Sequence, residues 1–200
     1  MMNITFEFII SGIIAISIIA LFIAILTDFI LYEKREEVKR EKKSIVATGT
    51  MVMYYFIYLI IIKLKLGHIS ISDESLNIFI NVVGALLVLA GSIMNISGRI
   101  KLQSNWANHI KIYDNHSLVT TGIYSLVRHP LYVSLMIMLF GGSMAYANFL
   151  SAVLTIVIFI PFMYYRAKQE EVLLEKEFKN YAEYKKRTGM FFPKLWRRRF

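Results

Sequence analysis

The stretch TGIYSLVRHPLY, Thr121–Tyr132, places polar side chains directly before a long apolar segment. It holds a glycine, an Arg-His-Pro triplet and two tyrosines, and the apolar segment Leu131–Tyr146 follows at once. Proline lacks the N–H that the first turn of a helix leaves unpaired, so Pro130 suits a helix start. The sequence therefore predicts that one wall of a polar pocket lies where a membrane-spanning helix begins.

The composition of the chain is typical of a membrane protein. Of its 200 residues, 56% are hydrophobic, and the mean hydropathy is +0.53. Ordinary soluble domains are roughly 45–50% apolar. Several apolar runs approach the ~20 residues with which an α-helix crosses a bilayer. We expect an all-α integral membrane protein with about five transmembrane helices.

Five apolar segments are the expected spans: Ile4–Tyr32, Ser44–Ile62, Leu76–Ile96, Leu131–Tyr146 and Phe149–Tyr165. The last two are separated by only a few residues, which predicts a tight helical hairpin over 131–165. Ala147 and Asn148 lie near the outer tip of this hairpin.

Two further features concern the shape and packing of these helices. Gly84, Gly91 and Gly98 recur every seven residues in the third segment. Small residues on one side of a helix allow a close approach to a second helix in a bilayer, so they predict a packing seam. Pro161 lies inside the fifth segment and is expected to kink it.

The distribution of basic residues predicts the orientation in the membrane. Of 23 Lys and Arg residues, six lie in 32–43, four in 99–128 and eleven from Arg166 onward. Basic residues favour the cytoplasmic side, so we expect an outside N-terminus and a cytoplasmic site. The first run, with no Lys or Arg before it, is expected to be a true span and not a cleaved signal. Membrane orientation also explains the net charge of +9 better than binding to nucleic acid does.

The chain divides into two regions of one structural unit. Residues 1–100 are expected to form a three-span scaffold. Residues 101–200 hold a cytoplasmic loop at Leu102–Gly122, the hairpin and a charged C-terminal helix that begins at Arg166 and ends near Gly189. A loop of this length without secondary structure is usually functional or disordered. The apolar residues interleaved in it favour an ordered loop.

Familiar catalytic and metal motifs are missing. The chain has no cysteine, no His-Glu-x-x-His and no Gly-x-Gly-x-x-Gly after a strand. We therefore expect neither a metal site nor a nucleotide-phosphate loop. What remains is two polar clusters that face the same membrane leaflet: His116, Tyr124, Arg128, His129 and Tyr132, and Arg166, Glu170 and Glu171. Ionisable groups at the membrane are functional candidates by default.

The order and spacing of these motifs resemble the isoprenylcysteine carboxyl methyltransferase family. The resemblance lies in HSLVTTGIYSLVRHPLY, then Glu170-Glu171, then FKNYAEYKKR and a late proline. It covers about Ser104–Pro193, while the first three spans match only as hydrophobic helices. The related phospholipid N-methyltransferases share much of the pattern.

The resemblance implies a membrane enzyme that uses S-adenosylmethionine (SAM) without a Rossmann domain. It assigns cofactor binding to His116, Ser117, Leu118, Val119, Tyr124, His129, Pro130, Leu131, Tyr132 and Glu170. It places Arg166, four residues before that glutamate, beside the acceptor group.

The sequence departs from the family pattern at several positions. Ile123 replaces a frequent proline, Ser134 a frequent glycine, and Lys179 the glycine of a Phe-Gly-x-x-Tyr motif. A glutamine that precedes the His-x-Leu-Val segment has no clear counterpart, with His109 or Lys111 nearest. One cofactor contact is therefore unassigned.

The side chains favour a carboxylate as methyl acceptor. A carboxylate is already anionic and needs no general base, so Arg166 has only to orient it. An amine acceptor would need a proton removed, for which His129 or a tyrosine is available. The expected function is SAM-dependent methyl-ester formation on a lipophilic, isoprenylcysteine-like acceptor that enters from the lipid. The alternatives are a phospholipid N-methyltransferase, an NADPH-dependent sterol-type reductase and a non-catalytic membrane scaffold.

Overall fold

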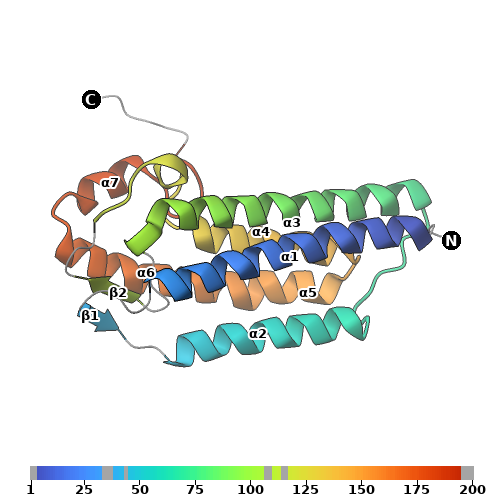
Figure 1. Ribbon diagram of the computed structural model, residues 1–200. Coiled ribbons are helices and arrows are strands. Elements are labelled where there is room, and N and C mark those ends of the chain that lie inside the picture. Colours follow the sequence, from blue (N-terminus) through green and yellow to red (C-terminus); the bar gives the residue numbers. More distant parts are fainter. Residues whose placement is uncertain (1–3, 33–37, 43–44, 106–109, 114–116, 195–200) are drawn as a thin grey trace.

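The computed structural model describes residues 4–32, 38–42, 45–105, 110–113 and 117–194. Its main feature is a bundle of helices that lie side by side (Figure 1). The bundle consists of α1 (Ile4–Tyr32), α2 (Ile45–Lys63), α3 (Glu74–Leu102), α4 (Pro130–Ala145) and a fifth rod made of α5 (Phe149–Leu154), the π-helix η3 (Thr155–Phe159) and α6 (Ile160–Glu177). The expected all-α membrane fold is confirmed.

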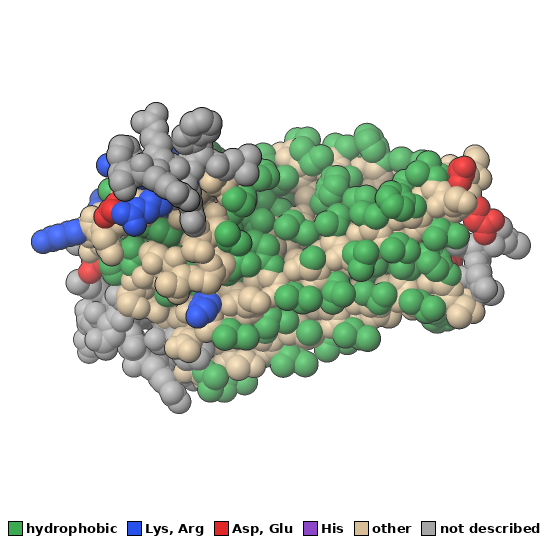
Figure 2. Space-filling model, turned by 90° about the horizontal axis from the view of Figure 1, so that it is seen from above, with side chains coloured by type: hydrophobic (Ala, Val, Ile, Leu, Met, Phe, Trp, Pro, Cys, Tyr) green, Lys and Arg blue, Asp and Glu red, His purple; other side chains and the backbone are tan. Residues whose placement is uncertain are grey.

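Three helices of the described chain are long and apolar enough to cross a membrane: Thr5–Leu31, Glu74–Leu102 and Phe149–Glu177. Gly49–Lys63 of α2 and Pro130–Ala145 of α4 are shorter apolar helices. Hydrophobic side chains cover the length of the bundle, while Lys and Arg gather toward one end (Figure 2). The count of five spans and the orientation in the membrane stay predictions.

The predicted seam joins α3 to α4. A Cβ built on Gly84 would lie 2.3 Å from the backbone nitrogen of Ala145, and one on Gly91 would lie 2.8 Å from the carbonyl oxygen of Ser134. A Cβ on Gly98 would meet the Leu131 side chain at 2.8 Å. Only glycine permits this approach, so the seam fixes the antiparallel contact between the two helices.

The hairpin is as predicted, and the helix type changes beside Pro161. α4 and α5 are joined through Tyr146–Asn148, and Asn148 caps α5 by accepting a hydrogen bond from the Ser151 N–H at 2.9 Å. Just before Pro161 the rod passes through the π-helix Thr155–Phe159. Because proline cannot donate to the preceding turn, a local change of helix type there is expected.

Two elements differ from the expectation for the polar segments. The connector after α1 and the loop after α3 form a two-stranded antiparallel sheet, β1 (Val38–Lys42) and β2 (Ile110–Tyr113), with Lys42 paired to Ile110. No strand pattern is visible in these two segments, because strands of four and five residues leave little periodicity. Short 3-10 turns, η1 (Gln103–Asn105) and η2 (Gly122–Ser125), also lie in the expected loop.

The C-terminal helix is not continuous from Arg166, and this part of the prediction is wrong. α6 ends at Glu177, Phe178 is extended, and α7 (Tyr181–Arg187) follows. The break returns Tyr181 and Tyr184 to the bundle, where both are buried. A straight helix would have carried them away from it. Lys179, which replaces the family's glycine, is not among the described residues with positive φ, so its backbone needs no glycine.

The close contact at the glycine seam predicts that adding a single methyl group to α3 is enough to force α3 and α4 apart. Gly84→Ala puts a Cβ against α4 backbone, so the helices must shift, and we expect a loss of about 1–3 kcal/mol of stability. Gly12→Ala in α1 is the control, because a Cβ there has nothing within 4 Å. Thermal unfolding in detergent measures both; equal melting temperatures would contradict the packing described.

Candidate active site

A cavity of about 770 Å³ runs between the helices and reaches the polar end of the bundle. Its apolar walls come from α1, α2, α3 and α4, with residues such as Ile18, Leu59 and Met138. Its polar end contains every described residue to which the sequence assigns a role: Ser117, Leu118, Val119, Tyr124, His129, Pro130, Leu131, Tyr132, Arg166 and Glu170. His116 and His109 lie outside the described residues, as does the side chain of Lys111.

Tyr132 links the two predicted clusters. Its hydroxyl donates to Glu170 Oε2 at 2.9 Å and accepts from Arg166 Nε at 3.3 Å. The sequence placed Arg166 and Glu170 one turn apart on a helix, and the structure joins them through the first turn of α4. Arg166 also reaches α2, where its Nη1 lies 3.6 Å from Met51 Sδ. The guanidinium therefore stands at the edge of the cavity next to α2.

His129 lies between two carboxylates. Its Nδ1 is 3.6 Å from Glu170 Oε2, its Nε2 is 3.4 Å from Glu171 Oε1, and its ring stacks on Tyr132 at 5.4 Å between centroids. Burial alone would lower the pKa of His129, but hydrogen bonds to both glutamates outweigh burial and raise the pKa above its ordinary value. The imidazole is therefore better suited to bearing a proton than to removing one.

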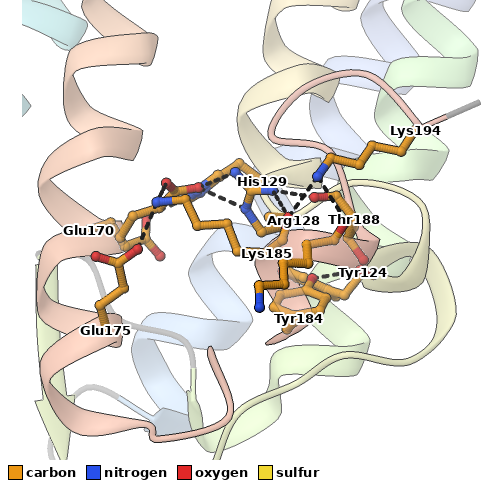
Figure 3. A network of polar contacts seen from close by, with 11 residues as sticks. Tyr124, Arg128, His129, Glu170, Glu175, Tyr184, Lys185, Thr188 and Lys194 are labelled. Carbon is orange, nitrogen blue, oxygen red and sulfur yellow. Dashed lines mark hydrogen bonds and ion pairs between the residues drawn. The ribbon is translucent and has the colours of Figure 1, made fainter. Parts of the chain in front are cut away.

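Arg128 makes a buried ion pair with Glu171. It also fastens the C-terminal segment, where it lies beside Thr188 (Figure 3). Its Nε and Nη2 lie 2.8 and 2.6 Å from Glu171 Oε1, and its Nη1 donates to the Thr188 carbonyl. The backbone N–H of Arg128 donates to Gly189 at 2.8 Å. Lys185 adds a second cation, 3.3 Å from Glu171 Oε2. This pair holds α4, α6 and the segment after α7 together.

The loop that carries Ser117–Val119 is tied to the end of α3. Asn105 Oδ1 accepts from the Ser117 N–H at 2.7 Å, and Asn105 Nδ2 donates to Ser117 Oγ at 3.2 Å. Asn105 itself lines the cavity. Sequence reasoning missed it, although an asparagine just past a helix end, in the segment that resembles the family, was a usable signal.

Three tyrosine hydroxyls that line the cavity are buried without a hydrogen-bond partner: Tyr55, Tyr124 and Tyr181. A buried hydroxyl without a partner costs about 1–3 kcal/mol, and such groups are rare. They are therefore suited to a polar ligand. Tyr55 lies in the second span, where an aromatic residue ordinarily serves packing. Its neighbours fit that view, since Tyr54 bonds Thr155 at 2.9 Å and Tyr58 donates to Leu139 at 2.7 Å.

Ser134, which replaces a frequent glycine of the family, is completely buried at the α3–α4 contact. Its hydroxyl accepts from Asn95 Nδ2 at 2.6 Å and donates to the Leu131 carbonyl at 2.7 Å. The departure therefore adds a polar link beside the glycine seam. Among the residues that the structure describes, no group of three or more His, Asp or Glu side chains is placed to hold a metal ion.

Residues 83–176 match the family model described as the isoprenylcysteine carboxyl methyltransferase (ICMT) family. The match extends from α3 to the last turn of α6, and it includes the RHP segment and both glutamates. The solved structure of the eukaryotic intramembrane Ras methyltransferase ICMT has a TM-score of 0.56 and 20% identity, and the alignment covers 76% of this chain and 53% of that one. This likeness shows a common fold.

Two curated relatives carry different names. The nickel-cobalt-cadmium resistance protein NccN of Alcaligenes xylosoxydans xylosoxydans is 33% identical over 139 residues, which are 68% of this chain and 60% of that protein. The protein-S-isoprenylcysteine O-methyltransferase of Xenopus laevis is 35% identical over 122 residues, 58% of this chain and 42% of that protein. The chain thus spans less than two thirds of the length of either relative.

The buried pair predicts an asymmetric response to mutation. Arg128→Met leaves the Glu171 carboxylate buried and should cost about 3–5 kcal/mol of stability. Replacing both residues, Arg128→Met with Glu171→Leu, should cost less than the single change. Arg187→Ala is the control, because its pair with Glu183 is exposed and contributes about 0–1 kcal/mol. Chemical unfolding in detergent measures the series, and a double variant less stable than Arg128→Met would contradict this account.

The raised pKa of His129 predicts a pH dependence of stability. A group with a higher pKa in the folded state stabilises that state fully below its unfolded pKa, about 6.5, and loses this contribution as pH rises through the folded pKa. We expect the melting temperature to fall as the pH rises above the unfolded pKa of about 6.5, and to fall less steeply for His129→Gln. Parallel curves for the two proteins would show that His129 does not carry this dependence.

Proposed function

Residues 83–176 of this chain belong to the isoprenylcysteine carboxyl methyltransferase family, and from that premise we propose that the protein is a SAM-dependent membrane methyltransferase. Its acceptor is a lipophilic carboxylate of the isoprenylcysteine type, which it converts to a methyl ester. The observation that carries the proposal is that one cavity joins the described cofactor candidates to Arg166 and to long apolar walls.

The residues at the polar end fit the proposed cofactor. SAM has ribose hydroxyls, an ammonium and a carboxylate, and the unpaired hydroxyls of Tyr124 and Tyr181 offer hydrogen bonds to such groups. Glu170, fixed by Tyr132, can accept from the ammonium or from ribose. The faces of Tyr124 and Tyr132 favour a nearby cation. The Ser117–Val119 backbone, held by Asn105, is available to the adenine.

When bound, SAM supplies an electrophilic methyl group on its sulfonium, which a carboxylate oxygen accepts without any proton transfer. Arg166 orients the acceptor, since a guanidinium matches a carboxylate with two parallel hydrogen bonds. Positioning of this kind accounts for much of the rate gain in a reaction that needs no base. The apolar walls exclude water, which strengthens the electrostatic interactions inside the cavity.

The raised pKa of His129 supports a carboxylate over an amine acceptor. An amine must lose a proton during methylation, and the imidazole is held between Glu170 and Glu171 with a raised pKa. Burial also raises the pKa of Tyr124 and of Tyr181, so neither phenol is a ready base. The phospholipid N-methyltransferase remains the second candidate because its family shares the motifs.

The site is proposed to face the cytoplasm. Most of the 23 basic residues fall in segments at the end of the bundle that holds α7 and the two-stranded sheet, whereas the N-terminus lies at the opposite end (Figure 1). The positive-inside rule places the first of these ends in the cytoplasm. The acceptor reaches the cavity sideways, past the lipid-exposed Phe22 and Val52.

Measurements of cofactor binding and of turnover should distinguish the role of Glu170 from that of Arg166. Glu170→Ala should abolish S-adenosylhomocysteine binding in calorimetry, because it removes the carboxylate that Tyr132 presents. Arg166→Ala should retain binding but lower methyl transfer roughly a hundredfold. Lys168→Ala is the control, since Lys168 is exposed on the same helix over the ring of Tyr164. Near-wild-type activity in the two site variants would refute the assignment, and no binding by the wild type would refute the function.

The acceptor is identified by direct comparison of two substrates. Methyl transfer from radiolabelled SAM to an S-prenylcysteine analogue should exceed transfer to phosphatidylethanolamine in the same vesicles. A preference for the amine lipid would establish the N-methyltransferase instead.

A further inference from the structure

Asp28 and Arg99 form an ion pair between two membrane-spanning helices. Arg99 Nη1 lies 2.6 Å from Asp28 Oδ2, and their side chains are only 12% and 8% exposed. Arg99 Nε donates to Asn95 Oδ1 at 2.8 Å, and Asn95 in turn bonds Ser134. Charges inside spanning helices are expensive to bury, so such a pair is a functional candidate. Neither the methyl-transfer chemistry nor the acceptor contact described above uses it.

Arg99 lines the cavity on the side of the proposed cofactor. The charge of Arg99 acts on the buried Tyr124 hydroxyl, where it opposes the effect of burial, which raises the pKa of that group. Asn105, which holds the Ser117–Val119 loop, follows at the end of the same helix, and both it and Arg99 line the cavity. Arg166 instead contacts Met51 of α2. The two guanidiniums therefore stand on different walls, one beside the cofactor loop and one beside α2.

Two arginines besides Arg128 line the cavity, Arg99 and Arg166. Among the described residues that line the cavity, the positively charged candidates are Arg99, Arg128, His129 and Arg166. Arg128 has its Nε and Nη2 on Glu171 and its Nη1 on the Thr188 carbonyl, and His129 lies between two glutamates. Methyl-ester formation brings two carboxylates into one cavity, that of the amino-acid end of the cofactor and that of the acceptor.

We propose that Arg99 binds the carboxylate of the amino-acid end of the cofactor, and that Asp28 and Asn95 are positioning residues that hold its guanidinium against the cavity. The inference rests on the proposed function and adds a residue that the family resemblance does not assign. Arg166 is then left for the acceptor alone. The arrangement suits the chemistry, since arginine has five N–H donors in a rigid fork, and the two bonds from Nε and Nη1 fix the plane of that fork.

A pair of ligands that differ only in this carboxylate tests the proposal. S-adenosylhomocysteine carries it, and S-adenosyl-3-thiopropylamine lacks it. In calorimetry with the full chain in detergent, Arg99→Gln should weaken S-adenosylhomocysteine binding roughly tenfold to a hundredfold, the range for a charge-assisted hydrogen bond. Its affinity for the decarboxylated ligand should stay within about threefold of wild type, which also shows that the variant is folded. Lys101→Gln, exposed in the last turn of α3, is the control and should change neither.

A variant of Asp28 tests its proposed role as a positioning residue. Asp28→Asn should weaken S-adenosylhomocysteine binding selectively but less than Arg99→Gln does, because the guanidinium is present but less well fixed. Arg99→Lys keeps the charge beside Asp28 and should show an intermediate, still selective loss; it replaces Arg99→Gln if that variant does not fold.

The two ligands distinguish carboxylate binding by Arg99 from a purely structural role of its ion pair with Asp28. An equal loss of affinity for both ligands would show that the ion pair only supports the fold, and unchanged affinity for S-adenosylhomocysteine would show that Arg99 does not meet the carboxylate; either overturns the proposal. If the wild type binds S-adenosylhomocysteine and the variants show no selectivity, the proposed function survives without this residue. If the wild type binds neither ligand, the proposed function fails and the inference fails with it.

Discussion

The contact between the start of α4 and one turn of α6 is the constraint on which the site depends. Consecutive residues on a helix point about 100° apart, so Glu170 and Glu171 cannot face the same partner. Glu170 meets Tyr132 at the cavity, and Glu171 meets Arg128 behind it. His129 lies between the two carboxylates and couples them. One short polar segment therefore both shapes the pocket and anchors the protein's C-terminal part, since Arg128 also holds Thr188 and Gly189.

Features that follow from residue type and local spacing could be predicted from the sequence. The helix start at Pro130, the hairpin, the seam of three glycines and the residues that line the polar end of the cavity are all of this kind. Each needs only one helix, or one motif, to be recognised. The role of these residues in cofactor binding stays a prediction.

Features that depend on partners far apart in the chain were not predictable in this way. The ion pair of Asp28 with Arg99 joins residues 71 positions apart, and each residue taken alone looks like the charged end of a span. The pairing of β1 with β2 and the break at Phe178 are likewise decided by contacts with distant segments. The buried, unpaired hydroxyl of Tyr55 could not be foreseen either, since an aromatic residue in a span has packing as its ordinary role.

The seven-residue spacing of the glycines in α3 leaves the alignment of α3 on α4 degenerate. Sliding α3 by one heptad, about 10 Å, would bring two of the three glycines back onto equivalent positions of the seam. Close backbone packing therefore favours several alignments almost equally. Asn95 removes this degeneracy, because its bonds to Ser134 and to the Leu131 carbonyl form in one alignment only. A single amide thus decides the height at which Arg99, one turn further along α3, stands relative to α4, as buried polar residues decide the register of coiled coils.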